Sequence, residues 1–202
     1  MRLIISEQHI REHIEDHLPR PPAAVRAEVD RLMHLRTRHM CHEVMRLAEC
    51  PHPDRDLLAP AAVRLWLRMA PSPIGPSVPL ERWRALWAVT GYTVDGEPAE
   101  RPSTSRLLYR GSRRPYGVCW TEDPASALAF ATAHGFVERS AAEVDLWATE
   151  MPPEALWARM PLGMAGRRVV CDEWVVDPDL IGPVRRWTTE ELAATPRARV
   201  LA

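Results

Sequence analysis

The sequence changes character near residue 100, and this change constrains the fold more than any other feature of the chain. Before that point apolar residues recur at a helical period, whereas after it they gather in short β-type runs. The 20 prolines, against 9 glycines, interrupt both parts and limit the length of each element. Strands with few helices between them indicate a segregated sheet. The sequence therefore predicts an α+β protein, with a helical region at 1–100 and a small mixed β-sheet domain at 101–202.

Periodicity and capping residues predict the helices of the first part. Ser6 is a suitable N-cap, and Pro60 is tolerable only in the first turn of a helix. Trp83 and Trp87 lie four residues apart, on one helix face, and Gly91 follows as a stop. We predict helices over about 6–19, 23–50, 58–69 and 80–89, with a proline-rich linker at 71–79.

The second part predicts four strands and one helix. Asp123 is a good N-cap, Pro124 suits the first helical position, and Gly135 suits the end of that helix. The apolar runs that predict strands are 107–109, 117–120, 144–148 and 169–176.

Charge and composition exclude several classes of function. All 26 basic residues are arginine, which the codon usage of a GC-rich genome explains, and 27 acidic residues leave a net charge of -1. The absence of lysine excludes a Schiff base and a P-loop lysine. A balanced charge also lacks the basic footprint of a typical nucleic-acid-binding protein. The remaining cations are planar guanidinium groups, which suit carboxylate or phosphate.

Histidine and cysteine gather in the first part without the spacing of a metal site. His9, His13 and His17 share one helix face, and a second group lies at 39–52. Neither H-E-x-x-H nor C-x-x-C occurs, so we expect an amphipathic helix rather than a zinc site, and no metal. The scattered cysteines indicate a reduced, cytoplasmic protein, and the longest apolar runs are too short to span a membrane. The group at 39–52 comprises His39, Cys41, His42, Cys50 and His52.

Four short motifs follow one another in the second part. They are Tyr109-Arg110-Gly111, the run Gly117-Val118-Cys119-Trp120-Thr121, the segment 151–158 with paired prolines, and Glu173 within 172–178. Their order resembles that of small bacterial and phage mono-ADP-ribosyltransferase domains of the Arg–Ser/Thr–Glu type. In those domains a Y-R-G strand, a W-T strand, a v-P-P-e-a-i-l-A turn and an E-v-v-v-D-P strand recur. The resemblance covers about residues 105–182.

The resemblance implies an enzyme that cleaves NAD as a substrate and transfers ADP-ribose to a macromolecular acceptor, protein or nucleic acid. Such a protein acts as a toxin, an effector or a phage-conflict protein, with a cognate inhibitor as a possible partner. Glu173 aligns with the catalytic glutamate, Thr121 with the serine or threonine that orients it, and Arg110 with the arginine that binds NAD. The residues implied in NAD binding are Tyr109, Arg110, Gly111, Trp120, Thr121 and Phe130.

The chemistry of NAD cleavage requires residues of these types. Loss of nicotinamide passes through an oxocarbenium-like state, which a nearby carboxylate stabilises. Arg110 at a strand end offers bidentate donors to phosphate. Neighbours on a strand face opposite ways, so Trp120 and Thr121 can both reach the site only if the strand ends there.

Each residue also has a purely structural interpretation. Arg110 could pair with Asp172 at the surface, Thr121 could cap the helix at Asp123, and Glu173 could lie exposed on an edge strand. Two further functions stay open: an NAD glycohydrolase with water as the acceptor, and an inactive binding module that kept the fold.

The acceptor is constrained by one departure from the family pattern. Family members that modify arginine carry a second acid two residues before the glutamate, and here that position is Cys171. Asp172 is adjacent but is expected to face the opposite side of the strand. A base, hydroxyl or thiol acceptor is therefore favoured over arginine. The helical region, with 13 arginines against 14 acidic residues, could brace the sheet, bind a partner or present nucleic acid.

Overall fold

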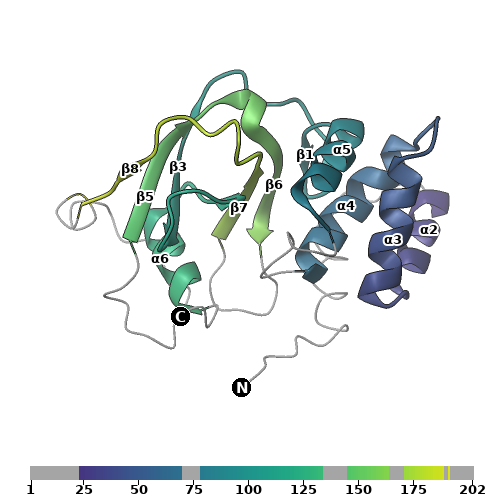
Figure 1. Ribbon diagram of the computed structural model, residues 1–202. Coiled ribbons are helices and arrows are strands. Elements are labelled where there is room, and N and C mark those ends of the chain that lie inside the picture. The colour runs from purple at the N-terminus through teal and green to yellow at the C-terminus, as the bar shows by residue number, and fades with distance from the viewer. Residues whose placement is uncertain (1–22, 70–77, 134–144, 164–170, 189–190, 192–202) are drawn as a thin grey trace. The chain divides into compact units, whose positions relative to one another are not determined.

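The computed structural model describes residues 23–69, 78–133, 145–163, 171–188 and 191 (Figure 1). Within these ranges the residues up to Glu100 form one compact unit, and those from Arg101 onward form another. The helix predicted over 6–19, most of the proline-rich linker and Gly135 lie outside the described residues. In the described ranges no helix is both long enough and apolar enough to cross a membrane.

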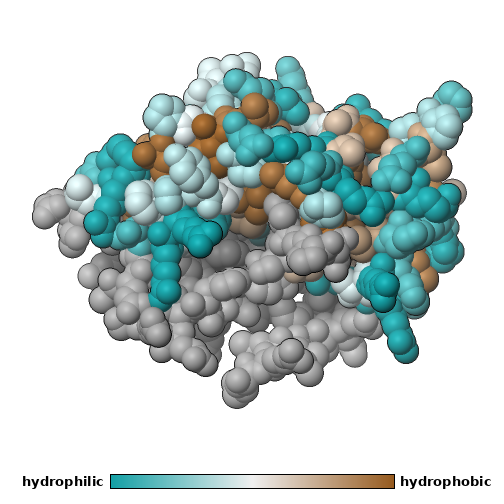
Figure 2. All heavy atoms as spheres, in the orientation of Figure 1, coloured by the Kyte–Doolittle hydropathy of each residue, from teal (hydrophilic) through white to brown (hydrophobic). Residues whose placement is uncertain are grey.

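The helical unit contains α2 (Ala23–Met33), α3 (Thr37–Ala48), α4 (Arg55–Met69) and α5 (Leu80–Thr90). A short antiparallel hairpin follows, formed by β1 (Thr93–Val94) and β2 (Glu97–Pro98). The side of α2 and α3 in view is largely hydrophilic (Figure 2), as expected for amphipathic helices. Arg31–Glu28 and Arg46–Glu43 ion pairs lie on these two helices.

The prediction of a single helix over 23–50 is wrong, because α2 ends at Met33 and α3 begins at Thr37. Arg68 of α4 contacts both sides of the break: its Nη1 donates a hydrogen bond of 2.7 Å to the carbonyl of Met33, and its Nε donates one of 3.1 Å to Thr37 Oγ1. One guanidinium thus holds the end of α2 and the start of α3. Apolar periodicity continues through the break, and so periodicity alone could not locate it.

Three tryptophans form the centre of the helical unit. Trp66 of α4 meets Trp83 of α5 edge-to-face at 4.9 Å between ring centroids, and Trp87 lies 6.3 Å from Trp83. All three side chains are buried. The structure starts α4 at Arg55, earlier than predicted, and this places Pro60 inside the helix rather than in its first turn.

The second unit contains two small antiparallel sheets rather than the single expected sheet. One has the order β3-β5-β8, formed by β3 (Arg106–Ser112), β5 (Asp145–Met151) and β8 (Arg185–Arg186). In the other, β7 (Cys171–Val176) lies between β6 (Leu156–Gly163) and β4 (Cys119–Trp120). The predicted helix is α6 (Pro124–Ala133), and the predicted proline turn is the 3-10 helix η2 (Pro153–Ala155).

A pair of backbone hydrogen bonds links β3 of one sheet to the residue that follows β4 of the other. Tyr109 of β3 and Thr121, which follows β4, exchange hydrogen bonds of 2.7 Å and 2.9 Å. The ring of Tyr109 packs with Ala127 of α6 and Ala148 of β5 in a buried cluster. Trp187, which is partly buried, packs against this cluster. This bridge brings the end of β4 and the start of α6 against the middle of β3.

Candidate active site

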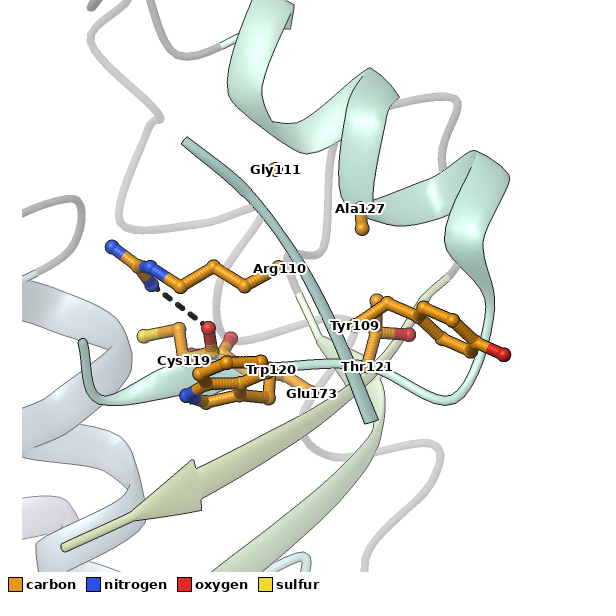
Figure 3. A pocket seen from close by; sticks show the side chains of 8 residues that line it. All are labelled: Tyr109, Arg110, Gly111, Cys119, Trp120, Thr121, Ala127 and Glu173. Atoms are coloured by element: carbon orange, nitrogen blue, oxygen red, sulfur yellow. Dashed lines mark hydrogen bonds between the residues drawn. The ribbon is translucent and has the colours of Figure 1, made fainter. Parts of the chain in front are cut away.

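A pocket in the second unit is lined by side chains from β3, β4, α6 and β7 (Figure 3). The empty space within it is about 310 Å³, part of which is open solvent. The three residues predicted to be catalytic, which are scattered along the sequence, all line it. The lining residues are Tyr109, Arg110, Gly111, Cys119, Trp120, Thr121, Ala127 and Glu173.

Strand alternation on β7 turns Glu173 toward the pocket. Its neighbours Asp172 and Trp174 face the other side, where Arg159 pairs with Asp172 and lies over the Trp174 ring. Glu173 is only 6% exposed, on a strand held between β6 and β4. The interpretations of Glu173 as an exposed edge residue and of Asp172 as the partner of Arg110 are therefore wrong.

Thr121 lies where β4 ends and α6 is about to begin. Its Oγ1 accepts a hydrogen bond of 3.2 Å from the backbone N–H of Asp123, so the hydroxyl hydrogen is available to another acceptor. The cap of α6 is Asp123 itself, whose Oδ2 accepts from the Ser126 N–H at 2.8 Å. Thr121 is 5% exposed and lines the pocket.

Arg110 places a largely buried guanidinium at the pocket. Its Nη1 donates a hydrogen bond of 2.8 Å to the carbonyl of Cys119, whereas its buried Nε has no hydrogen-bond partner among the described residues (Figure 3). Burial lowers the pKa of Arg110 below its usual range, and Cys119 and Glu173, when ionised, oppose this shift. Arginine stays charged at physiological pH, so this cation has unused donors suited to an anionic ligand.

Gly117 makes room for that guanidinium. A Cβ at this position would lie 2.6 Å from Arg110 Nη2 and 2.7 Å from its Nε, closer than real contacts allow. The indole Nε1 of Trp120 donates a hydrogen bond of 2.8 Å to the carbonyl of Gly117, which ties the Trp120 side chain to the segment before β4.

Trp120 and Thr121 both line the pocket because β4 ends at Trp120. Strand alternation lets both side chains reach the site only if the strand ends there, and this condition is met. Trp120 and Glu173 both border the pocket (Figure 3). Tyr109 borders the pocket, but its ring points away from Arg110 and meets Trp187 edge-on at 4.8 Å. The side chain of Phe130 lies outside the described residues.

Two lining residues were not predicted to belong to the site. Cys119 lies two residues before Thr121, and the period of a strand could have identified it. Ala127 lies one turn before Phe130 on α6, which made it predictable only once that helix was placed against β3.

The histidine and cysteine group at 39–52 lies on α3 and in the segment that follows it. Nowhere in the described ranges do three His, Cys, Asp or Glu side chains converge as ligands. Cys41 is buried on α3, whereas His39 and His42 are exposed, and Cys50 Sγ donates to the carbonyl of Arg46. His9, His13 and His17 lie outside the described residues.

Comparison of the chain with protein-family models, with curated proteins and with solved structures gave no match. The function is therefore inferred from the residues of the pocket and from the order of the motifs that supply them.

Proposed function

We propose that this protein is a mono-ADP-ribosyltransferase that cleaves NAD and transfers ADP-ribose to a protein or nucleic acid. The observation that carries the proposal is the meeting of Arg110, Thr121 and Glu173 in one pocket. We infer with it that the second unit has an ADP-ribosyltransferase-like fold. The motif order that the chain shares with these enzymes supports the same assignment.

Glu173 is the proposed catalytic carboxylate. Cleavage breaks the bond between ribose C1′ and the nicotinamide nitrogen, and nicotinamide leaves with the bonding electrons as a neutral base. The ribose then carries positive charge, which the carboxylate stabilises while it accepts a hydrogen bond from the 2′-hydroxyl. A carboxylate with little exposure is suited to this role, because low local polarity strengthens its interaction with the cation.

Thr121 and Arg110 hold the reacting groups in place. The Thr121 hydroxyl hydrogen is available to orient Glu173, since the oxygen already accepts from Asp123 N–H. The Arg110 guanidinium has donors for a phosphate of NAD. Trp120 provides an aromatic face for the cationic nicotinamide ring before cleavage.

The lining of the pocket suits one end of NAD rather than the whole molecule, because it offers one carboxylate, Glu173, and one guanidinium, Arg110. The nicotinamide and its ribose would occupy this space, with Arg110 directed at the phosphates.

The acceptor is proposed to be a group other than arginine. Glu173 is the only carboxylate among the described lining residues, and Asp172 pairs with Arg159 on the opposite face of β7. A guanidinium acceptor needs a second acid to position it, whereas a base, hydroxyl or thiol does not. Such a transferase would act in the cytoplasm as a toxin, an effector or a phage-conflict protein, and a cognate inhibitor would then be a further partner.

Incubation with adenine-labelled NAD and cell lysate tests the proposal. We expect nicotinamide release together with label on a macromolecule, and digestion by nuclease or protease then identifies the acceptor class. Free ADP-ribose as the sole product would instead assign an NAD glycohydrolase. No nicotinamide release, with NAD binding retained, would favour a binding module that lost the chemistry.

A further inference from the structure

The described part of the chain contains three cysteine side chains in different surroundings. Cys41 is buried in α3, where desolvation raises the pKa of its thiol. Cys50 is partly exposed, and its Sγ donates to the carbonyl of Arg46. Cys119 is partly exposed as well, but it alone of the three lines the pocket. The role proposed above for Arg110, Thr121 and Glu173 leaves this thiol without a function.

The guanidinium of Arg110 lies on the same side of the pocket as the Cys119 thiol (Figure 3). Its Nη1 donates a hydrogen bond of 2.8 Å to the carbonyl of Cys119, and its buried Nε has no hydrogen-bond partner among the described residues. A nearby cation favours the thiolate, which is the nucleophilic form of cysteine. The same cation attracts anionic molecules into the pocket.

We propose that Cys119 is a thiol-modification site, at which small anionic disulfides form a mixed disulfide inside the pocket. The reagent binds through its carboxylates to the Arg110 guanidinium, and this holds its sulfur atoms near Sγ of Cys119. Selectivity over Cys50 comes from the setting of this charge, because the arginine beside Cys50, Arg46, is half exposed and pairs with Glu43, whereas Arg110 lines the pocket.

The chemistry is a thiol–disulfide exchange. The Cys119 thiolate attacks one sulfur of the reagent, a new S–S bond forms to Cys119, and the S–S bond of the reagent breaks. The second half of the reagent leaves as a thiolate and takes a proton from water according to its pKa. The reagent is the oxidant, and a monothiol in excess reverses the step.

The adduct would also control the proposed transferase. This part rests on the proposed function, because it requires that NAD occupy the same pocket. A substituent on Cys119 would fill the space beside Arg110 and Glu173 and exclude the nicotinamide end of NAD. Oxidation by anionic disulfides would therefore switch the enzyme off, and reduction would restore it.

The experiment measures the rate at which each cysteine is modified in the full chain. The protein is treated with dithiobis-nitrobenzoate, which is dianionic, or with cystamine, which is dicationic, and peptide mass mapping follows each cysteine over time. Cys119→Ser removes the proposed target, and Cys50→Ser is the matched control. Arg110→Gln tests the contribution of charge, with thermal melting to confirm that the variant is folded.

We expect Cys119 to react with the dianionic reagent at least about tenfold faster than with the dicationic one, and faster than Cys50. The adduct should persist in Cys50→Ser and vanish in Cys119→Ser, and Arg110→Gln should reduce the charge preference. Equal rates at Cys119 and Cys50, or no charge preference in the unsubstituted protein, would overturn the proposal.

NAD protection separates this inference from the proposed function. We expect saturating NAD to slow modification of Cys119 and to leave that of Cys50 unchanged. Selective, charge-dependent modification without protection by NAD would uphold the thiol site and contradict NAD as the occupant of the pocket. NAD turnover without selective modification of Cys119 would uphold the proposed function and contradict the thiol site.

Discussion

Because Gly117 has no side chain, the guanidinium of Arg110 can lie against it at the pocket. The two residues are in contact only in the folded chain, and a Cβ on Gly117 would overlap the end of the arginine side chain. The sequence predicted Arg110 from its motif, but Gly117 had no visible role beyond being the first residue of the next motif. A contact that depends on a missing side chain becomes visible only in three dimensions.

Gly117→Ala should therefore impair NAD binding while leaving stability nearly unchanged. The displaced group is the end of a flexible side chain, so the backbone need not move. We expect a raised KM for NAD in nicotinamide release and an unfolding free energy within about 0.5 kcal/mol of the original protein. A KM equal to that of the unsubstituted protein would show that Arg110 does not bind NAD from this position.

Arg110→Lys should raise KM for NAD by roughly tenfold or more. Lysine is a point charge and cannot replace the paired N–H donors of a guanidinium, and hydrogen bonds to charged groups contribute about 1.5–3 kcal/mol. Nicotinamide release at varied NAD concentration measures the effect. Arg186→Lys is the control, since Arg186 is exposed on β8 and pairs with Asp145, and its KM should not change.

At the scale of elements, the helix α6 was predicted from its capping residues, and the structure has it where predicted. Asp123 accepts the first N–H groups of the helix and Pro124 is its first residue, two local signals that need no tertiary context. By contrast, the two sides of the break between α2 and α3 are held by Arg68 from another helix, and β6 begins directly after η2 without a turn signal of its own. The helix α6 was therefore predictable from local residues, whereas the α2–α3 break and the start of β6 were not.

Asp123→Ala should lower the free energy of unfolding by about 1 kcal/mol, the usual cost of losing an N-cap. The hydrogen bonds that Asp123 accepts from Ala125 and Ser126 would be lost. Denaturant unfolding measures the change. Glu122→Ala, next to it and exposed, should have an effect within about 0.5 kcal/mol; a larger effect than that of Asp123→Ala would contradict the assignment of the cap.

The hairpin of β1 and β2 carries an electrostatic cost at Glu97. Burial, with Asp56 nearby, raises the pKa of Glu97 above its ordinary value of 4.5. The folded state therefore binds a proton more tightly than the unfolded state, and stability is lost as pH rises through the window just above 4.5. Glu97→Gln should raise the melting temperature at neutral pH and have little effect below about pH 4. An equal shift at both pH values would contradict this origin.

At the scale of the whole molecule, the chain divides between a helical unit and a sheet unit that contains the pocket. The order of motifs correctly placed Arg110, Thr121 and Glu173 together, although β3, β4 and β7 are far apart in sequence. The division of the strands into two sheets was not predictable, because it depends on which strands pair across long stretches of sequence. The acceptor was not predictable either, because no described residue marks it directly.

The central claim is that the carboxylate of Glu173 stabilises the cation formed when NAD loses nicotinamide. Nicotinamide release by Glu173→Gln, compared with Glu154→Gln, tests it most directly, since Glu154 is an exposed glutamate in η2 outside the pocket lining. We predict that Glu173→Gln stays folded and loses about 10²–10³-fold or more in kcat, whereas Glu154→Gln keeps full turnover. A folded Glu173→Gln variant that releases nicotinamide at the original rate would contradict the account.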